Sequence, residues 1–215
     1  MSALDKITAI KTTKLAEECH KKFPLAQSVK DAIAKTNREE FVPAGFRHNA
    51  YKLDALPMGS SQWISSPLTV AKMTQYLEPK KEDKVLEIGC GSGYQAAVLS
   101  HLFRGVFTIE RIEPLILEAK QRFRKLGINN IHTKLDDGQS GWAQYAPFER
   151  ILFSATAKEI PQKIFDQLSD GGILVAPMQN GSKQIIVRFR KKGQSIQKEE
   201  LEGCDFVPIL DGIQK

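Results

Sequence analysis

The sequence predicts an α/β fold: a Rossmann-like, doubly wound sheet of seven strands with an antiparallel edge, preceded by a small N-terminal helical cap. An apolar run at 85–88 ends in a glycine-rich turn and an Ala/Val/Leu-rich segment, the strand, turn and helix that open a nucleotide-binding unit. Strand-length apolar segments then alternate with helical segments as far as residue 175, which is typical of a parallel sheet. Residues 184–189 alternate apolar and polar, as an antiparallel strand does. The 215 residues suffice for one domain, which we divide into a cap at 1–60 and a core at 61–215.

The first 60 residues predict two helices followed by an irregular loop. The first helix, over 4–20, carries apolar residues at an imperfect helical spacing: Leu4, Ile7, Ile10, Leu15 and Cys19. The second has Pro24 in its first turn and an apolar face made by Leu25, Val29, Ala32 and Ile33. The helical spacing ends at Phe41-Val42-Pro43, because a residue before proline is driven towards extended conformations. Two roles fit this cap: closing over a cofactor site, or packing alone.

A polar loop at 56–67 leads into the core and contains one large aromatic residue, Trp63. Ser66 is a suitable N-cap for a helix that begins at Pro67 and carries its inward residues at Val70, Met73 and Leu77. On local grounds alone, capping is enough to explain Ser65 and Ser66.

The later elements follow from the same patterns. A helix is expected to start at Pro114 and to end at Gly127, with these residues at helical spacing: Ile116, Ala119, Lys120, Phe123 and Leu126. A helix from Pro161 is expected to end at Gly171-Gly172, and the last strand near Phe206-Val207-Pro208. Five strands are expected, at 85–88, 106–109, 131–135, 151–153 and 173–175.

The glycine turn follows the pattern Glu87-x-Gly89-x-Gly91-x-Gly93. Glycines let the backbone turn sharply and approach a ligand that any Cβ would push away. Dinucleotide-binding turns usually have Gly where this chain has Tyr94, so the spacing favours S-adenosylmethionine (SAM) over a nicotinamide cofactor. A purely structural strand-to-helix turn is the third alternative.

Acidic residues at two further strand ends support a cofactor site. Glu110 follows the strand at 106–109, about 20 residues past the glycine turn, where a carboxylate accepts hydrogen bonds from ribose hydroxyls. Asp137 follows the strand at 131–135 and is suited to an adenine amino group, with Gly138 allowing a close approach. Because the carboxyl ends of parallel strands meet at one edge of a sheet, we expect both acids and Glu87 to converge there.

Charge and composition narrow the class of protein. A net charge of +6 raises the question of nucleic acid, but the basic residues are scattered among acids, so we predict a solvated surface and no nucleic-acid partner. No apolar run approaches the roughly 20 residues of a membrane span, and the N-terminus lacks the pattern of a signal peptide. Three scattered cysteines suggest no disulfide framework and favour the cytoplasm. The four histidines lack metal-ligand spacing, so no metal is predicted, and we expect a monomer.

Most of the chain resembles the protein-L-isoaspartate O-methyltransferases. The shared segments lie between residues 41 and 208: Phe41-Val42-Pro43, Ala55-Leu56-Pro57-Met58-Gly59, Gln62-Trp63-Ile64-Ser65-Ser66-Pro67, Val85 to Leu99, Asp137-Gly138, Ala146-Pro147-Phe148, Pro161, Gly171-Gly172 and Phe206-Val207-Pro208. The resemblance implies SAM-dependent methylation of the α-carboxylate of isoaspartyl residues in aged proteins and peptides, the first step of their repair.

The resemblance also assigns roles to residues. It implies that Ser65 is the active-site serine and that Gln62, Trp63 and Ile64 lie at the acceptor site. It places the methionine end of SAM against Glu87 and the turn glycines Gly89, Gly91 and Gly93, the ribose on Glu110, and the adenine on Asp137 and Gly138.

The acceptor loop departs from the family pattern. The family's loop usually reads Gly-Gln-Gly-Gln-Thr-Ile-Ser, whereas this chain has Ser61 in place of a glycine and Trp63 in place of a threonine. The small hydroxyl residue usual after Val-Pro-Leu is also missing around Ile209. These changes leave two alternatives beside isoaspartyl repair: a SAM-dependent transferase with another acceptor, and a SAM-binding module without transferase activity.

Overall fold

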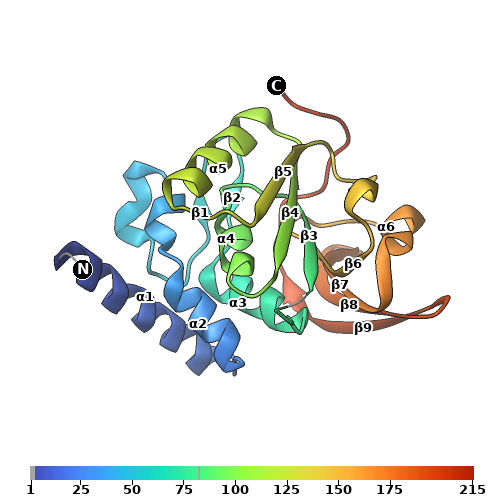
Figure 1. The fold of residues 1–215 in the computed structure, drawn as a ribbon, viewed down its shortest axis with the longest axis horizontal. Helices are drawn as coiled ribbons and strands as arrows, with labels where there is room; N and C mark the ends of the chain where they lie inside the picture. Colours follow the sequence, from blue (N-terminus) through green and yellow to red (C-terminus); the bar gives the residue numbers. More distant parts are fainter. Residues whose placement is uncertain (1–2, 82) are drawn as a thin grey trace.

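The computed structural model describes residues 3–81 and 83–215, and its centre is one seven-stranded sheet in the order β5-β4-β3-β6-β7-β8-β9 (Figure 1). The strands are β3 (Lys84–Ile88), β4 (Gly105–Glu110), β5 (Ile131–Leu135), β6 (Phe148–Phe153), β7 (Leu168–Asn180), β8 (Lys183–Lys192) and β9 (Ser195–Cys204). Strands β3 to β7 pair in parallel, while β8 and β9 are antiparallel to their neighbours. The predicted doubly wound sheet and its antiparallel edge are confirmed.

The chain reverses its direction across the sheet next to β3. From β3 it steps outward to β4 and then β5, and it returns to the other side of β3 to form β6. The register pairs Leu86 of β3 with Phe107 of β4 and with Ile151 of β6. In open α/β sheets ligands bind at such a reversal, beyond the carboxyl ends of the strands.

The helices surround the sheet and form the cap. They are α1 (Ala3–Lys22), α2 (Gln27–Lys35), α3 (Pro67–Tyr76), α4 (Tyr94–Ser100), α5 (Glu113–Lys125) and α6 (Gln162–Asp166), with 3-10 helices η1 (Arg38–Phe41), η2 (Ala44–Asn49) and η3 (Ala143–Tyr145). As predicted, the Ser66 hydroxyl caps α3 by accepting the Thr69 N–H at 3.0 Å. Within the described residues, none of the helices combines the length and the apolar content needed to cross a bilayer.

The two faces of the sheet pack against different elements. On one face Val85 and Val106 join a large cluster with residues of the cap and of α3, α4 and α5. On the other face Leu86 and Phe107 join a smaller cluster with α6 and the aromatic residues around Phe148. Because strand residues alternate between faces, β3, β4, β6, β7 and β8 each contribute to both clusters, and the cap shares one continuous core with the sheet.

A short hairpin joins the cap to the core. Strand β1 (Leu56–Pro57) pairs antiparallel with β2 (Trp63–Ile64), and Leu56 lies opposite Ile64. The cap boundary that we placed at residue 60 falls in the turn of this hairpin.

The N-terminal helices differ from prediction in two ways. Ile7 and Ile10 are 50% and 69% exposed, because at 3.6 residues per turn they project away from the buried stripe that contains Leu15 and Cys19; the side chain of Leu4 lies outside the described residues. Helix α2 begins at Gln27 rather than at Pro24. The intervening backbone is extended because its N–H groups bind side chains: Leu25 N–H donates to His20 Nδ1 at 3.1 Å, and Ala26 N–H donates to Gln75 Oε1 at 2.8 Å.

In the core, one helix face and two element boundaries also differ from prediction. Lys120 of α5 and Leu126, which follows its last residue, are exposed, and the buried face includes Leu115 instead. Helix α6 ends at Asp166, because the Gln167 side chain bonds the backbone of residues 140, 142 and 163, so Gly171-Gly172 lies within β7. Strand β9 ends at Cys204, because the Gln184 side chain forms hydrogen bonds with both the N–H and the C=O of Phe206. The chain then crosses towards Thr156.

Candidate active site

A pocket of about 970 Å³, partly open to solvent, lies beyond the carboxyl ends of β3, β4, β5 and β6. Its walls come from the glycine turn after β3, the segments 109–112 and 136–137, the loop at 154–155, the β1–β2 hairpin with the start of α3, and the C-terminal segment 206–210. This is the position that the strand reversal predicts.

The glycine turn forms the floor of the pocket between β3 and β4. The N–H groups of Gly89 and Cys90 donate to the Ile109 carbonyl at 2.9 and 3.0 Å, which ties the turn to the end of β4. Gly89 and Gly91 line the pocket, whereas Gly93 does not. A Cβ on Gly93 would lie 2.7 Å from the Phe123 ring, so this glycine serves the packing of α4 against α5.

Glu87 lies beneath the turn and does not line the pocket. Its side chain is fully buried; the Thr108 hydroxyl donates to one carboxyl oxygen at 2.6 Å and the Ser154 hydroxyl to the other at 3.2 Å. Burial raises the pKa of Glu87 to about 8, because desolvation outweighs these two hydrogen bonds. Glu87 therefore orients Ser154, which does line the pocket, and supports the site from below.

Glu110 stands at the end of β4 with its carboxylate held in place by the backbone. Gly91 N–H donates to Oε2 at 2.8 Å and Ile112 N–H to Oε1 at 3.0 Å. The side chain is only 6% exposed, and it lines the pocket. Each carboxylate oxygen retains a free lone pair, so the fixed group can accept two further hydrogen bonds from a ligand.

Asp137 lines the pocket at the end of β5, next to Asp136. It accepts the Gln139 N–H on Oδ1 at 3.1 Å and the Gly212 N–H on Oδ2 at 3.3 Å. Gly138 lies behind it and does not line the pocket; a Cβ there would lie 2.5 Å from Ile88 Cγ2, so close packing against β3 requires this glycine.

The hairpin forms the opposite wall, where Gln62, Trp63, Ile64 and Ser65 all line the pocket. Ile64 is buried, while Trp63 is 56% exposed at the rim. The turn of the hairpin places two serines, Ser60 and Ser61, at φ of 59° and 54°, a left-handed conformation that side chains disfavour.

Sequence reasoning missed several lining residues. Tyr94, Gln95, Arg111 and Ser154 line the pocket, as does the C-terminal segment that we expected to be a strand. Their proximity to the strand ends was a usable signal for Arg111 and Ser154, since each follows a predicted buried strand. The C-terminal segment gave no such signal, because its place depends on Thr156, which exchanges backbone hydrogen bonds with Val207 and Ile209 at 2.8 Å.

The strand order, the glycine turn and the acids at the ends of β4 and β5 together define the class of SAM-dependent methyltransferases. Comparisons with known proteins refine this class. The family model "Protein-L-isoaspartate(D-aspartate) O-methyltransferase (PCMT)" matches residues 11–214.

Relatives are similar in sequence along nearly the whole chain. A protein-L-isoaspartate O-methyltransferase of Helicobacter pylori (strain P12) is 57% identical over 209 residues, covering 97% of this chain and 100% of the relative. One from Dictyoglomus thermophilum is 44% identical, covering 93% and 90%. A solved protein-L-isoaspartate O-methyltransferase superposes with a TM-score of 0.84 at 26% identity; the match covers 94% of this chain and 66% of that longer one.

The chain belongs to the protein-L-isoaspartate(D-aspartate) O-methyltransferase family. The predicted activity, SAM-dependent methylation of isoaspartyl residues in protein repair, and the predicted cofactor are thereby confirmed. A nicotinamide oxidoreductase and a SAM-binding module without transferase activity are set aside.

Proposed function

We propose that the pocket holds SAM along the strand ends and the isoaspartyl carboxylate against the hairpin, with Ser65 as the residue that orients the carboxylate. The observation that supports this most is that Glu110, Asp137 and Ser65 line one continuous pocket although they come from three distant segments. The test is transfer of labelled methyl to an isoaspartyl peptide, with the matching aspartyl peptide as control. We expect base-labile label on the isoaspartyl peptide alone; equal labelling of both peptides would contradict the assignment.

The cofactor wall suits the parts of SAM. Glu110 presents two free lone pairs at fixed positions, as a ribose diol requires, and Asp137 presents a carboxylate for an amino group. Gly89 and Gly91 leave the turn without side chains, so the chain of the ligand can lie against the backbone. When bound, SAM supplies a methyl group on a sulfonium, which is an activated leaving group.

The acceptor wall needs little chemistry of its own. A carboxylate is already ionised at neutral pH, so no general base is needed to create the nucleophile. Ser65 forms no side-chain hydrogen bond with the residues that the structure describes, so its hydroxyl is available to donate to a carboxylate oxygen. Apolar residues including Ile88, Ile109 and Leu115 line the interior and exclude water. Positioning of the two reactants therefore supplies most of the rate.

Trp63 is proposed to contact the protein substrate beside the isoaspartyl residue. Its indole is more than half exposed at the rim, where it can lie against the chain that flanks the acceptor. Gln62 and Ile64 on either side of it complete the acceptor site, with buried Ile64 fixing the wall.

We also propose that the enzyme is a cytoplasmic monomer that acts on damaged proteins and peptides and has no nucleic-acid partner. The three free cysteines, two of them buried, support a reducing compartment. The pocket is formed within one chain, which supports a monomer. Sedimentation at low and high protein concentration, with and without duplex DNA, tests this; a stable dimer or a DNA complex would contradict it.

A further inference from the structure

Arg38 is a buried arginine on the far side of the acceptor wall. It is the first residue of η1 and has 0% exposure. No ion pair with a described carboxylate accompanies it, and desolvation by burial lowers its pKa below the usual value for arginine. A buried guanidinium is costly unless its N–H groups are satisfied. Nε of Arg38 has no partner among the described residues, so the hydrogen bonds of the two terminal nitrogens indicate what the side chain holds together.

The guanidinium fork binds backbone carbonyls from two separate segments. Nη1 donates to Ala50 O at 3.0 Å, and Nη2 donates to Asp54 O at 2.9 Å. Nη2 also donates to Ser65 O at 3.1 Å. One planar group thus joins the cap segment 50–54 to the active-site serine, which lies 27 residues further along the chain than Arg38.

The face of the same guanidinium lies against the cofactor side of the pocket. Its central carbon is 5.6 Å from the centroid of the Tyr94 ring. Tyr94 is the first residue of α4, directly after the glycine turn, and it lines the pocket. Arg38 therefore touches both an element that carries Ser65 and an element that follows the glycine turn, which fixes the distance between the two walls.

We infer that Arg38 is a positioning residue for methyl transfer. Through its contacts with the Ser65 carbonyl and the Tyr94 ring, it holds Ser65 at a fixed position relative to the glycine turn. The inference rests on the proposed role of Ser65. It differs from a role in stability alone, because it predicts an effect on the acceptor and none on cofactor affinity.

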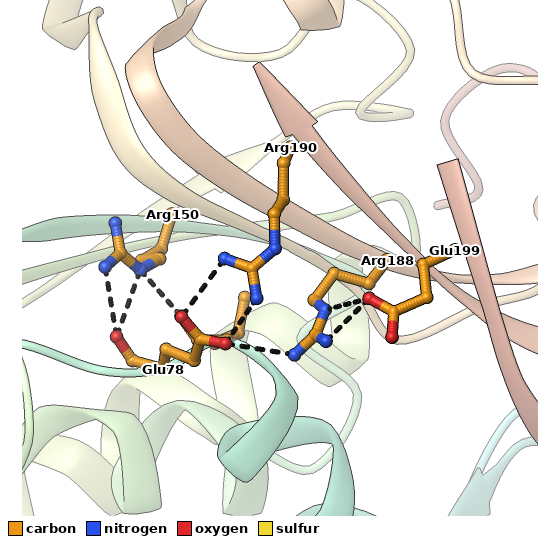
Figure 2. A network of polar contacts seen from close by, with 6 residues as sticks. Glu78, Arg150, Arg188, Arg190 and Glu199 are labelled. Atoms are coloured by element: carbon orange, nitrogen blue, oxygen red, sulfur yellow. Dashed lines mark hydrogen bonds and ion pairs between the residues drawn. The ribbon is translucent and has the colours of Figure 1, made fainter. Parts of the chain in front are cut away.

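A second buried arginine provides a matched control. Arg150 of β6 is 5% exposed, donates to Leu77 O at 2.6 Å and to Glu78 O at 3.0 Å, and does not line the pocket. Figure 2 shows it beside Glu78, which also pairs with Arg188 and Arg190, and Arg188 in turn pairs with Glu199. Arg150 has the same side chain, a similar burial and similar carbonyl partners, but it lies in β6 next to the end of α3 and does not line the pocket. Unlike Arg38, it also pairs with a carboxylate, that of Asp83, at 3.1 Å.

The first experiment compares Arg38→Lys with Arg150→Lys. Lysine keeps the charge but cannot form the fork, so Ser65 O loses its anchor. We expect Arg38→Lys to lower kcat/KM for an isoaspartyl peptide about 10- to 100-fold, the usual effect of a small misplacement, with SAM affinity by calorimetry unchanged. Arg150→Lys should leave both quantities unchanged. An unchanged kcat/KM in Arg38→Lys, or equal losses in both variants, would overturn the inference.

A second experiment reads the position of the acceptor wall without turnover. The chain has two tryptophans, so a Trp142→Phe background leaves Trp63, two residues from Ser65, as the only one. We expect Arg38→Lys in this background to shift Trp63 emission and its quenching by acrylamide, and Arg150→Lys to leave both unchanged. Identical Trp63 signals in the Arg38 variant and its parent would contradict the inference.

A third experiment uses the wild-type protein, in case the Arg38 variants do not fold. Hydrogen exchange should show residues 50–54 and 63–66 opening as one unit, because one guanidinium bonds both segments. Separate opening rates would overturn the inference. If wild-type enzyme failed to methylate the isoaspartyl peptide, the proposed function would fall, while fluorescence and exchange would still decide whether Arg38 places Ser65.

Discussion

The two walls of the pocket are supported in different ways. The cofactor wall consists of strand ends, and its key carboxylate, Glu110, is fixed by N–H groups of Gly91 and Ile112 from the ends of the same sheet. The acceptor wall is a hairpin of two-residue strands with two left-handed serines in its turn. Behind the hairpin, buried Arg38 donates to the Ser65 carbonyl, and Leu56 and Ile64 pack into the large core cluster.

This difference indicates that cofactor binding and acceptor specificity can change separately in this fold. The cofactor wall is part of the sheet, so a substitution there affects the core and the ligand together. The turn and rim of the acceptor wall, Ser60, Ser61 and Trp63, are exposed and lie outside the core cluster, so they can vary while the SAM site stays intact. Two of the three departures from the family pattern, Ser61 and Trp63, lie on the acceptor wall, and the third lies near Ile209 in the C-terminal segment that lines the pocket.

The largest expected effect concerns the buried acid of the cofactor wall. The folded-state pKa of Glu87, about 8, is above the value of about 4.3 in an unfolded chain. The folded state therefore holds an extra proton between these pH values, and stability falls as pH rises through this window. Relative to Glu87→Gln, the wild-type protein should lose about 3 kcal/mol of unfolding free energy between pH 5 and pH 8. Denaturant unfolding of both proteins at several pH values measures this; parallel pH profiles would contradict it.

The second-largest expected effect distinguishes the two walls, because it changes the binding of SAM and not that of the peptide. Glu110→Ala leaves two backbone N–H groups and the ribose hydroxyls without their partner, and should weaken SAM binding by about 1–3 kcal/mol. At saturating SAM, the KM for isoaspartyl peptide should stay the same. Calorimetry and initial rates test both parts, and an unchanged SAM affinity would refute the ribose assignment.

A smaller effect is expected at the rim of the acceptor wall. An indole that filled the acceptor space would make Trp63→Thr more active, but more than half of Trp63 is exposed, so we expect the opposite. Loss of an aromatic contact with the substrate should cost about 1 kcal/mol, seen as a raised peptide KM. SAM affinity is the internal control. A lowered KM would show that the indole obstructs the substrate.

The smallest effect concerns the turn of the hairpin. Ser61→Gly removes a side chain from a left-handed residue, and should raise the free energy of unfolding by about 0.5 kcal/mol, since relief of the strain exceeds the added chain entropy. Ser60→Gly is the matched variant at the neighbouring residue. Destabilisation of both variants by thermal melting would show that the serine side chains support the turn.

The same contrast explains how much could be predicted from the sequence. The glycine turn and Glu110 follow strands with strong apolar patterns, so their part of the cofactor wall could be placed from local sequence alone. The strand before Asp137 is apolar only at Ile131 and Leu135, and gives a weaker signal. The role of Glu87 could not, because its burial depends on Thr108 and Ser154 from neighbouring strands. The resemblance predicts that Gly93 and Gly138 contact the ligand, whereas each lies against a side chain, Phe123 or Ile88, that only the fold brings near.

The acceptor wall was less predictable, because its support is long-range. Residues 62–65 could be assigned only through a resemblance, since a polar loop has no periodicity to interpret. Arg38 looks like an ordinary charged residue in its sequence context, and nothing local indicates that it binds Ser65 O. The C-terminal segment was predicted as a strand because Phe206-Val207-Pro208 is apolar, while hydrogen bonds to Gln184 and Thr156 decide its course.

The account depends most on the claim that the two walls act separately, and Ser65→Ala tests it most directly. Ser65 lines the acceptor wall, and its side chain has no role in the hydrogen bonds that support the cofactor wall. We predict that kcat/KM for an isoaspartyl peptide falls about 10- to 100-fold while the Kd for SAM, measured on the same preparation, is unchanged. A Kd for SAM that weakens in parallel, or a kcat/KM equal to that of the wild type, would contradict the account.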